Sequence, residues 1–180
     1  IDDLKIANIL NSVKTIAMVG VSKNWKRPSN FAMKYLQKNG YQVIPVNPKE
    51  AGNLILGQLC YSNLEDIPIR IDMVDVFRKS NECFAIAKES IKIKVKVFWM
   101  QIGVINDKAV KLVEKNGITA VYNRCPKIEH SRIFGSLGSG GYYSKLISSK
   151  KQNFKYKNIK ARDSGFFQTK NLETLSVHAG

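Results

Sequence analysis

Short apolar runs alternate with longer amphipathic segments along most of the chain. The run at residues 16–19 is apolar on both faces, which is typical of a central strand in a parallel sheet. It ends at Gly20, where the backbone can turn sharply. Pro28 suits the first turn of a helix, and Asn39-Gly40 is a helix stop. Residues 15–40 therefore predict a strand, a glycine turn, a basic loop and a helix.

The same alternation recurs towards residue 135. Further strands are predicted at residues 41–46, 71–77, 95–100 and 118–122, and helices at residues 2–13, 80–93, 106–116 and from Pro126. Residues 51–68 form a connection with one helical turn at 64–67, and its apolar side chains are expected to pack into the core or to line the wall of the site: Leu54, Ile55, Leu56, Leu59 and Tyr61. Helical crossovers between strands imply an α/β fold, a doubly wound, mainly parallel five-stranded sheet with helices on both faces.

Ligands of such sheets bind outside the carboxyl ends of the strands, and here each end carries polar or cationic residues. In chain order they are Ser22, Lys23 and Arg27, then Asn47, Pro48 and Lys49, then Phe77 and Arg78, then Gln101 and Gly103, then Asn123 and Arg124. Cations stand at four of the five ends with no acid immediately beside them, which predicts an anionic ligand. The alternative is that Arg78 or Arg124 pairs with Asp72, Asp75 or Glu129.

The loop after the first strand lies before a helix N-terminus, which favours an anion, although a solvated basic loop has the same composition. It is not the dinucleotide fingerprint, because Gly20 is its one glycine. The second strand ends in Asn47-Pro48-Lys49, where an NAD site would have an acid. Lys49 would instead attract a phosphorylated ribose, so a nucleotide with an extra phosphate is favoured over NAD.

The 180 residues carry a net charge of +15, which raises the possibility of nucleic-acid binding. The lysines are spread over many predicted helix surfaces and no nucleic-acid-binding motif is present, so nucleic-acid binding stays as a minor alternative. Three widely spaced cysteines indicate reduced thiols and a cytoplasmic protein rather than a disulfide framework. No apolar run approaches the roughly 20 residues of a membrane span, no signal-peptide pattern opens the chain, and two histidines without a C-x-x-C pair predict no metal site.

Several blocks in order resemble the small single-domain CoA-binding proteins of bacteria: GVSKNWKRPS, GYQVIPVNPK, DMVDVFRKS, VFWMQIGVIN and NRCPKIE. These proteins are similar to the CoA-binding domain of the succinyl-CoA synthetase alpha subunit. The resemblance extends to about residue 151, through the glycine-rich segment GSLGSGGYYSKLISSKK. It implies a Rossmann-like domain over residues 1–151 that binds coenzyme A or an acyl-CoA.

The resemblance also implies roles for the residues at the strand ends. The first loop would take the phosphates, and the later ends would flank the nucleotide, the adenine and the pantetheine arm. The candidate cofactor-binding set is Gly20, Val21, Ser22, Lys23, Arg27, Pro28, Asn47, Pro48, Lys49, Phe77, Arg78, Gln101, Gly103 and Arg124. A pyrophosphate and a ribose phosphate fit such a set, since Arg and Lys are the residues that recognise polyphosphates.

We expect a binding protein rather than an enzyme. Succinyl-CoA synthetase uses a phosphorylated histidine in a second domain, and neither His130 nor His178 lies in a matching motif. Cys125, beside Arg124, is the one candidate nucleophile and could exchange with the CoA thiol, but a packed, inert cysteine is the preferred interpretation. The alternatives are a component of an acyl-CoA ligase that needs a protein partner, and an NADP-type nucleotide binder. A homo-oligomer is also compatible with the sequence.

Residues 152–180 differ from the rest of the chain: they are basic, with scattered apolar residues, and predict a flexible tail. The final NLETLSVHAG resembles the start of O-acetylhomoserine sulfhydrylase-type PLP enzymes, as a truncated fusion would. The segment holds no PLP lysine motif, so no activity is assigned to it.

Overall fold

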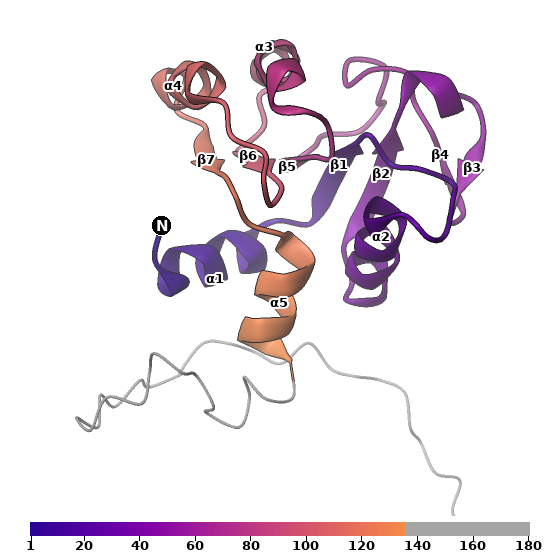
Figure 1. Cartoon of the computed structure of the whole chain (residues 1–180), viewed down its shortest axis with the longest axis horizontal. Helices are drawn as coiled ribbons and strands as arrows, with labels where there is room; N and C mark the ends of the chain where they lie inside the picture. Colours follow the sequence, from indigo (N-terminus) through magenta and orange to yellow (C-terminus); the bar gives the residue numbers. More distant parts are fainter. Residues whose placement is uncertain (136–180) are drawn as a thin grey trace, which may run out of the picture. The chain divides into compact units, whose positions relative to one another are not determined.

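The computed structural model describes residues 1–135, so the predicted boundary at residue 151 and the tail lie outside the described residues. Figure 1 shows the arrangement of the elements. In chain order they are α1 (Asp3–Ser12), β1 (Thr15–Val19), α2 (Pro28–Lys38), β2 (Gln42–Val46), η1 (Pro48–Glu50), β3 (Leu54–Ile55), β4 (Gln58–Leu59), β5 (Met73–Val76), η2 (Ser80–Glu82), α3 (Cys83–Lys92), β6 (Val97–Met100), α4 (Asp107–Lys115), β7 (Thr119–Val121) and α5 (Pro126–Phe134).

Five strands form one parallel sheet in the order β2-β1-β5-β6-β7, and β3 and β4 form a separate antiparallel hairpin. The predicted α/β fold is therefore confirmed. The chain runs from β1 to β2 through α2, and from β5 to β7 through α3 and α4 in the opposite direction across the sheet. The direction reverses between β1 and β5. This is the topological switch point, where doubly wound proteins bind their ligands.

Alternate side chains of each strand enter two separate hydrophobic cores. In β1, Ile16 and Met18 join the core that α1 and α2 cover, whereas Ala17 and Val19 join the core under α3 and α4. Figure 1 shows these helices on opposite sides of the sheet, with α5 on the side of α1 and α2. Burial on both faces explains why the strands read as continuous apolar runs rather than as alternating ones.

The connection between β2 and β5 differs from the prediction. It contains the β3–β4 hairpin, whose turn at Leu56 and Gly57 has positive φ at both residues. Leu54, Leu56 and Leu59 are 70, 38 and 45% exposed, so these three do not pack into the core, which was the first of the two expected places, whereas Ile55 is buried. A two-stranded ribbon turns alternate residues outward, which a pattern of leucines does not reveal. Residues 64–67 form a turn and no helix.

The amino ends of three strands meet at Asp72. Its Oδ2 accepts from the backbone N–H groups of Lys14 and Thr15 at 3.0 and 3.2 Å, and its Oδ1 lies 2.8 Å from Lys96 Nζ. Burial alone would raise the pKa of this carboxyl, but the bonds from Lys96, Lys14 and Thr15 outweigh it and lower the pKa to about 2. The charged form of Asp72 therefore joins the segments that enter β1, β5 and β6.

We predict that protonation of Asp72 makes the domain less stable in acid. Because folding lowers the pKa of Asp72, its carboxylate stabilises the folded domain at pH values above the ordinary pKa of an aspartate. This stabilisation is lost as the pH falls from about 4 to about 2. A shift from 3.8 to about 2 corresponds to about 2 kcal/mol of unfolding free energy. Asp72→Asn should lose this amount near neutral pH and flatten the acid limb of the stability profile, measured by urea unfolding at several pH values.

Asp66→Asn is the matched control, since it removes an exposed carboxylate from the turn at residues 62–66. An Asp72→Asn profile that keeps the wild-type slope below about pH 4 would contradict the assignment.

Candidate ligand-binding site at the carboxyl edge of the sheet

Gly20 brings the first loop against the neighbouring strands at the switch point. Its φ of +93° lies in the region that favours glycine, and its N–H donates to the Val46 carbonyl at 2.7 Å. A Cβ at this position would lie 2.4 Å from the carbonyl oxygen of Phe77 and 3.2 Å from Arg78 Cδ. The turn therefore needs glycine both for its backbone conformation and for its close contact with the end of β5.

The loop after Gly20 is held from behind by two buried residues at the start of α2. Ser29 Oγ accepts from the Ser22 N–H at 3.2 Å, and Asn30 Nδ2 donates to the Ser22 carbonyl at 3.0 Å. The loop's side chains Lys23 and Arg27 are exposed. Arg27 is the residue before α2 and provides no side-chain cap. Pro28 has no N–H, and the N–H groups of Asn30 and Phe31 donate to the Arg27 carbonyl at 3.0 and 3.3 Å, so the Ser29 N–H is the one at this helix end that keeps its capacity to bind an anion.

Asn47 connects three of the predicted site segments. Its Nδ2 donates to the Val21 carbonyl at 2.9 Å, and its Oδ1 accepts from Arg78 Nη2 and from the Lys49 N–H, both at 3.2 Å. The side chain thus joins the loop after β1, the short helix η1 after β2 and the end of β5. The predicted residues on these three segments lie together in the structure.

Acids lie nearer to the cations than the sequence indicated. Lys23 Nζ is 3.3 Å from Glu50 Oε2, and Arg78 Nε is 3.8 Å from Glu82 Oε2. Arg27 and Lys49 are exposed and make no ion pair within residues 1–135. Among the candidate cations, these two are the ones most available to an incoming anion.

The end of β6 carries a buried polar pair. Gln101 Nε2 donates to Asp75 Oδ1 at 2.7 Å, and burial raises the pKa of Asp75 to about 7, although the bond from Gln101 opposes the rise. Beside it, the N–H of Gly103 donates to Asn123 Oδ1 at 2.9 Å. Asp75 is not in the candidate set, although a carboxylate within the apolar stretch IDMVDVF is a sequence signal of such a position.

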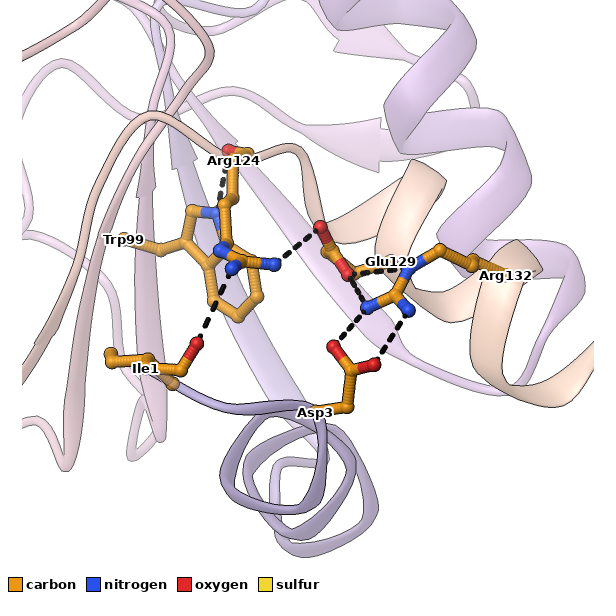
Figure 2. Close-up of polar contacts among 6 residues, drawn as sticks. All are labelled: Ile1, Asp3, Trp99, Arg124, Glu129 and Arg132. Carbon is orange, nitrogen blue, oxygen red and sulfur yellow. Dashed lines mark hydrogen bonds and ion pairs between the residues drawn. The ribbon is translucent and has the colours of Figure 1, made fainter. Parts of the chain in front are cut away.

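Arg124 is engaged within the protein, as Figure 2 shows. Its Nη1 lies 3.0 Å from Glu129 Oε1 and its Nη2 donates to the Ile1 carbonyl at 3.3 Å, while its own carbonyl accepts from Trp99 Nε1 at 2.8 Å. Pairing with Glu129 is the alternative that the sequence left open for this arginine. An open cavity of about 400 Å³ adjoins it, and none of its lining residues comes from the loop after β1: Ile1, Val121, Tyr122, Asn123, Arg124 and Glu129.

Neither remaining candidate for chemistry is activated. Burial raises the pKa of Cys125, which directly precedes α5, so its thiol stays protonated at neutral pH. His130 packs between Tyr35, Tyr41 and Phe134, its Nδ1 lies 3.1 Å from the Tyr35 hydroxyl, and burial lowers its pKa. The described part of the chain holds no cluster of metal-ligating side chains. It also has no helix with the length and apolarity that crossing a membrane requires.

The fold and this edge define a doubly wound α/β domain with cations and a helix N-terminus at its switch point. A family model described as a CoA binding domain matches residues 14–131. The uncharacterized protein YneT of Bacillus subtilis is 37% identical over 129 residues, which are 71% of this chain and 93% of that protein. The chain therefore belongs to the CoA-binding domain family, and the resemblance found in its sequence is confirmed.

Solved structures share this fold. A hypothetical protein from Pyrococcus horikoshii OT3 is 40% identical, with a TM-score of 0.71 over 75% of this chain and 94% of that chain. The dinucleotide-forming acetyl-coenzyme A synthetase 1 of Ca. Korarchaeum cryptofilum is 22% identical, with a TM-score of 0.54 over 61% of this chain and 26% of that chain. The second likeness concerns the fold alone.

We predict that Gly20→Ala destabilises the domain by more than about 2 kcal/mol, since it adds a clash with the Phe77 carbonyl to the strain of a positive φ. Gly117→Ala is the matched control, because Gly117 also has a positive φ, of +75°, but nothing lies within 4 Å of its added Cβ. Its cost should be about 1 kcal/mol. Urea unfolding would measure both, and equal losses would contradict the close contact.

Proposed function

We propose that this domain binds coenzyme A or an acyl-CoA in the crevice at the carboxyl ends of β1, β2, β5 and β6, and carries out no chemistry of its own. The observation that supports it most strongly is the junction at Asn47. The Asn47 side chain holds the loop after β1, Lys49 and Arg78 at one edge of the sheet. The chain belongs to the CoA-binding domain family, so CoA is the ligand proposed for this edge.

Each part of the ligand has a proposed partner. The pyrophosphate lies against the turn from Gly20 to Ser22, the N-terminus of α2 at Pro28, and the side chains of Lys23 and Arg27. The ribose phosphate lies near Lys49 and Pro48, and Phe77 and Arg78 flank the adenine. Gln101 and Gly103 line the path of the pantetheine arm. Phosphate oxygens favour helix N-termini and guanidinium groups, which supports this orientation.

Arg124 is not included in the proposed site. Its guanidinium is shared between Glu129 and the Ile1 carbonyl, and a ligand phosphate would have to displace both. The proposal of binding without catalysis is supported by the protonated thiol of Cys125 and by the aromatic packing of His130.

Calorimetric titration tests this function. We expect saturable binding of CoA, weaker binding of dephospho-CoA because Lys49 loses its phosphate partner, and still weaker binding of NADP. Arg27→Ala should weaken CoA binding about tenfold, the typical effect of one charge-assisted phosphate contact. Lys38→Ala is the matched control, since it removes one exposed cation from the other end of α2.

Equal affinities for CoA and dephospho-CoA would contradict the role of Lys49. An equal effect of Arg27→Ala and Lys38→Ala would mean that net charge alone attracts the ligand. Tight NADP binding by a folded protein that does not bind CoA would support the nucleotide-binder alternative instead.

A further inference from the structure

Asp75 is the most deeply enclosed carboxyl of the sheet. It lies on β5 between Met18 of β1 and Trp99 of β6, and no part of it is exposed. Its Oδ1 accepts from Gln101, but its Oδ2 is, among residues 1–135, the one buried side-chain oxygen or nitrogen without a hydrogen-bond partner. A buried unpaired oxygen is costly, so this arrangement calls for an explanation.

Gln101 links the buried Asp75 to the carboxyl edge of the sheet through their hydrogen bond. Its backbone is held on both sides, with its N–H donating to the Val76 carbonyl at 3.4 Å and its carbonyl accepting from the Val104 N–H at 2.9 Å. Its Oε1 has no bond to the described residues and is not among their enclosed unpaired atoms. Because Asp75 occupies the Nε2 end of the amide, this oxygen is the end left for a ligand on the proposed pantetheine path.

The protonation of Asp75 decides which end of the Gln101 amide faces outward. An ionised carboxylate only accepts hydrogen bonds, so the amide must turn its Nε2 inward and its Oε1 outward. A protonated carboxyl can donate to the amide oxygen, which allows the amide to rotate and present its Nε2 group to the crevice. One proton inside the sheet thus selects an acceptor or a donor at the ligand site.

The surroundings of Asp75 leave this proton exchangeable near neutral pH. Burial raises its pKa to about 7, opposed by the bond from Gln101, and no charged side chain of the described residues contributes. The neighbouring strands present Met18 and Trp99, which do not titrate in this range. From the residues just before α5, the facing titratable group is Cys125, whose own pKa the Asp75 charge helps to raise.

We propose that Asp75 is a positioning residue whose ionised form holds the Gln101 amide with its oxygen toward the crevice, where it accepts a hydrogen bond from an amide N–H of the pantetheine arm. The proposal rests on the proposed CoA-binding function. It makes ligand binding and proton release one linked process, because the ligand selects the ionised form of Asp75.

The test is a series of CoA titrations between about pH 6 and pH 8.5. If only the ionised form binds, the apparent affinity of the wild type falls about tenfold for one pH unit below the pKa of Asp75. Asp75→Asn is the conservative variant, since its amide does not titrate and, like the protonated carboxyl, can either accept from or donate to Gln101. It should lose the added pH dependence and bind CoA no more tightly than the wild type does at high pH.

Gln101→Met is the second variant. It should bind CoA more weakly than the wild type at high pH, with none of the pH dependence that Asp75 causes, because the amide that couples the two sites is gone. The phosphates of CoA titrate identically in all three experiments, so the comparison between variants isolates the contribution of Asp75. Carbon-13 NMR of the Asp75 carboxyl gives an independent measurement, and saturation with CoA should lower its titration midpoint.

Two results would overturn the proposal while leaving CoA binding intact. One is a pH dependence that Asp75→Asn retains in full, and the other is a carboxyl midpoint that CoA does not lower. An affinity that rises on acidification would overturn the assigned orientation of the amide. Failure of the folded wild type to bind CoA at any pH would overturn the proposed function and this inference with it.

Discussion

The contact between Gly20 and the end of β5 is the constraint on which the rest of this site depends. With no room for a Cβ beside the Phe77 carbonyl, the chain leaves β1 in a left-handed turn and rises directly above the switch point of the sheet. The loop that follows can then reach Asn47, and Asn47 in turn holds Arg78. A wider turn would separate the ends of β1, β2 and β5, and the cations they carry would no longer share one edge.

Two carboxyls on the same short segment show how strongly position decides electrostatic behaviour. Asp72 lies at the amino ends of the strands, where backbone N–H groups and Lys96 favour its charge and lower its pKa to about 2. Asp75 lies three residues further along, inside the sheet, where burial favours its neutral form and raises its pKa to about 7. The first stabilises the fold as an ion, whereas the second places an ionisable group directly beneath the proposed ligand path.

Local patterns predicted the regular elements well, because each depends on a signal carried by neighbouring residues. Pro28 begins α2 as expected, and Asn106 caps α4 through a 2.9 Å bond from the Ala109 N–H. The hairpin at residues 54–59 was missed, because its leucines are exposed in the structure but make the sequence look like a buried segment. Glu50 and Glu82 were missed as partners of Lys23 and Arg78, because the sequence offered only Asp72, Asp75 and Glu129 as acids for the arginines at the strand ends.

The sequence by itself determined the alternation of strands and helices, the need for glycine at the first turn, the cationic residues at the strand ends and the resemblance to CoA-binding proteins. These follow from side-chain type and spacing along the chain. Only the tertiary structure decided which cations remain unpaired, that Arg124 joins Glu129 and Ile1, and that Asp75 is enclosed beneath Gln101. Such properties depend on neighbours distant in the sequence and on the exclusion of water, which no local pattern contains.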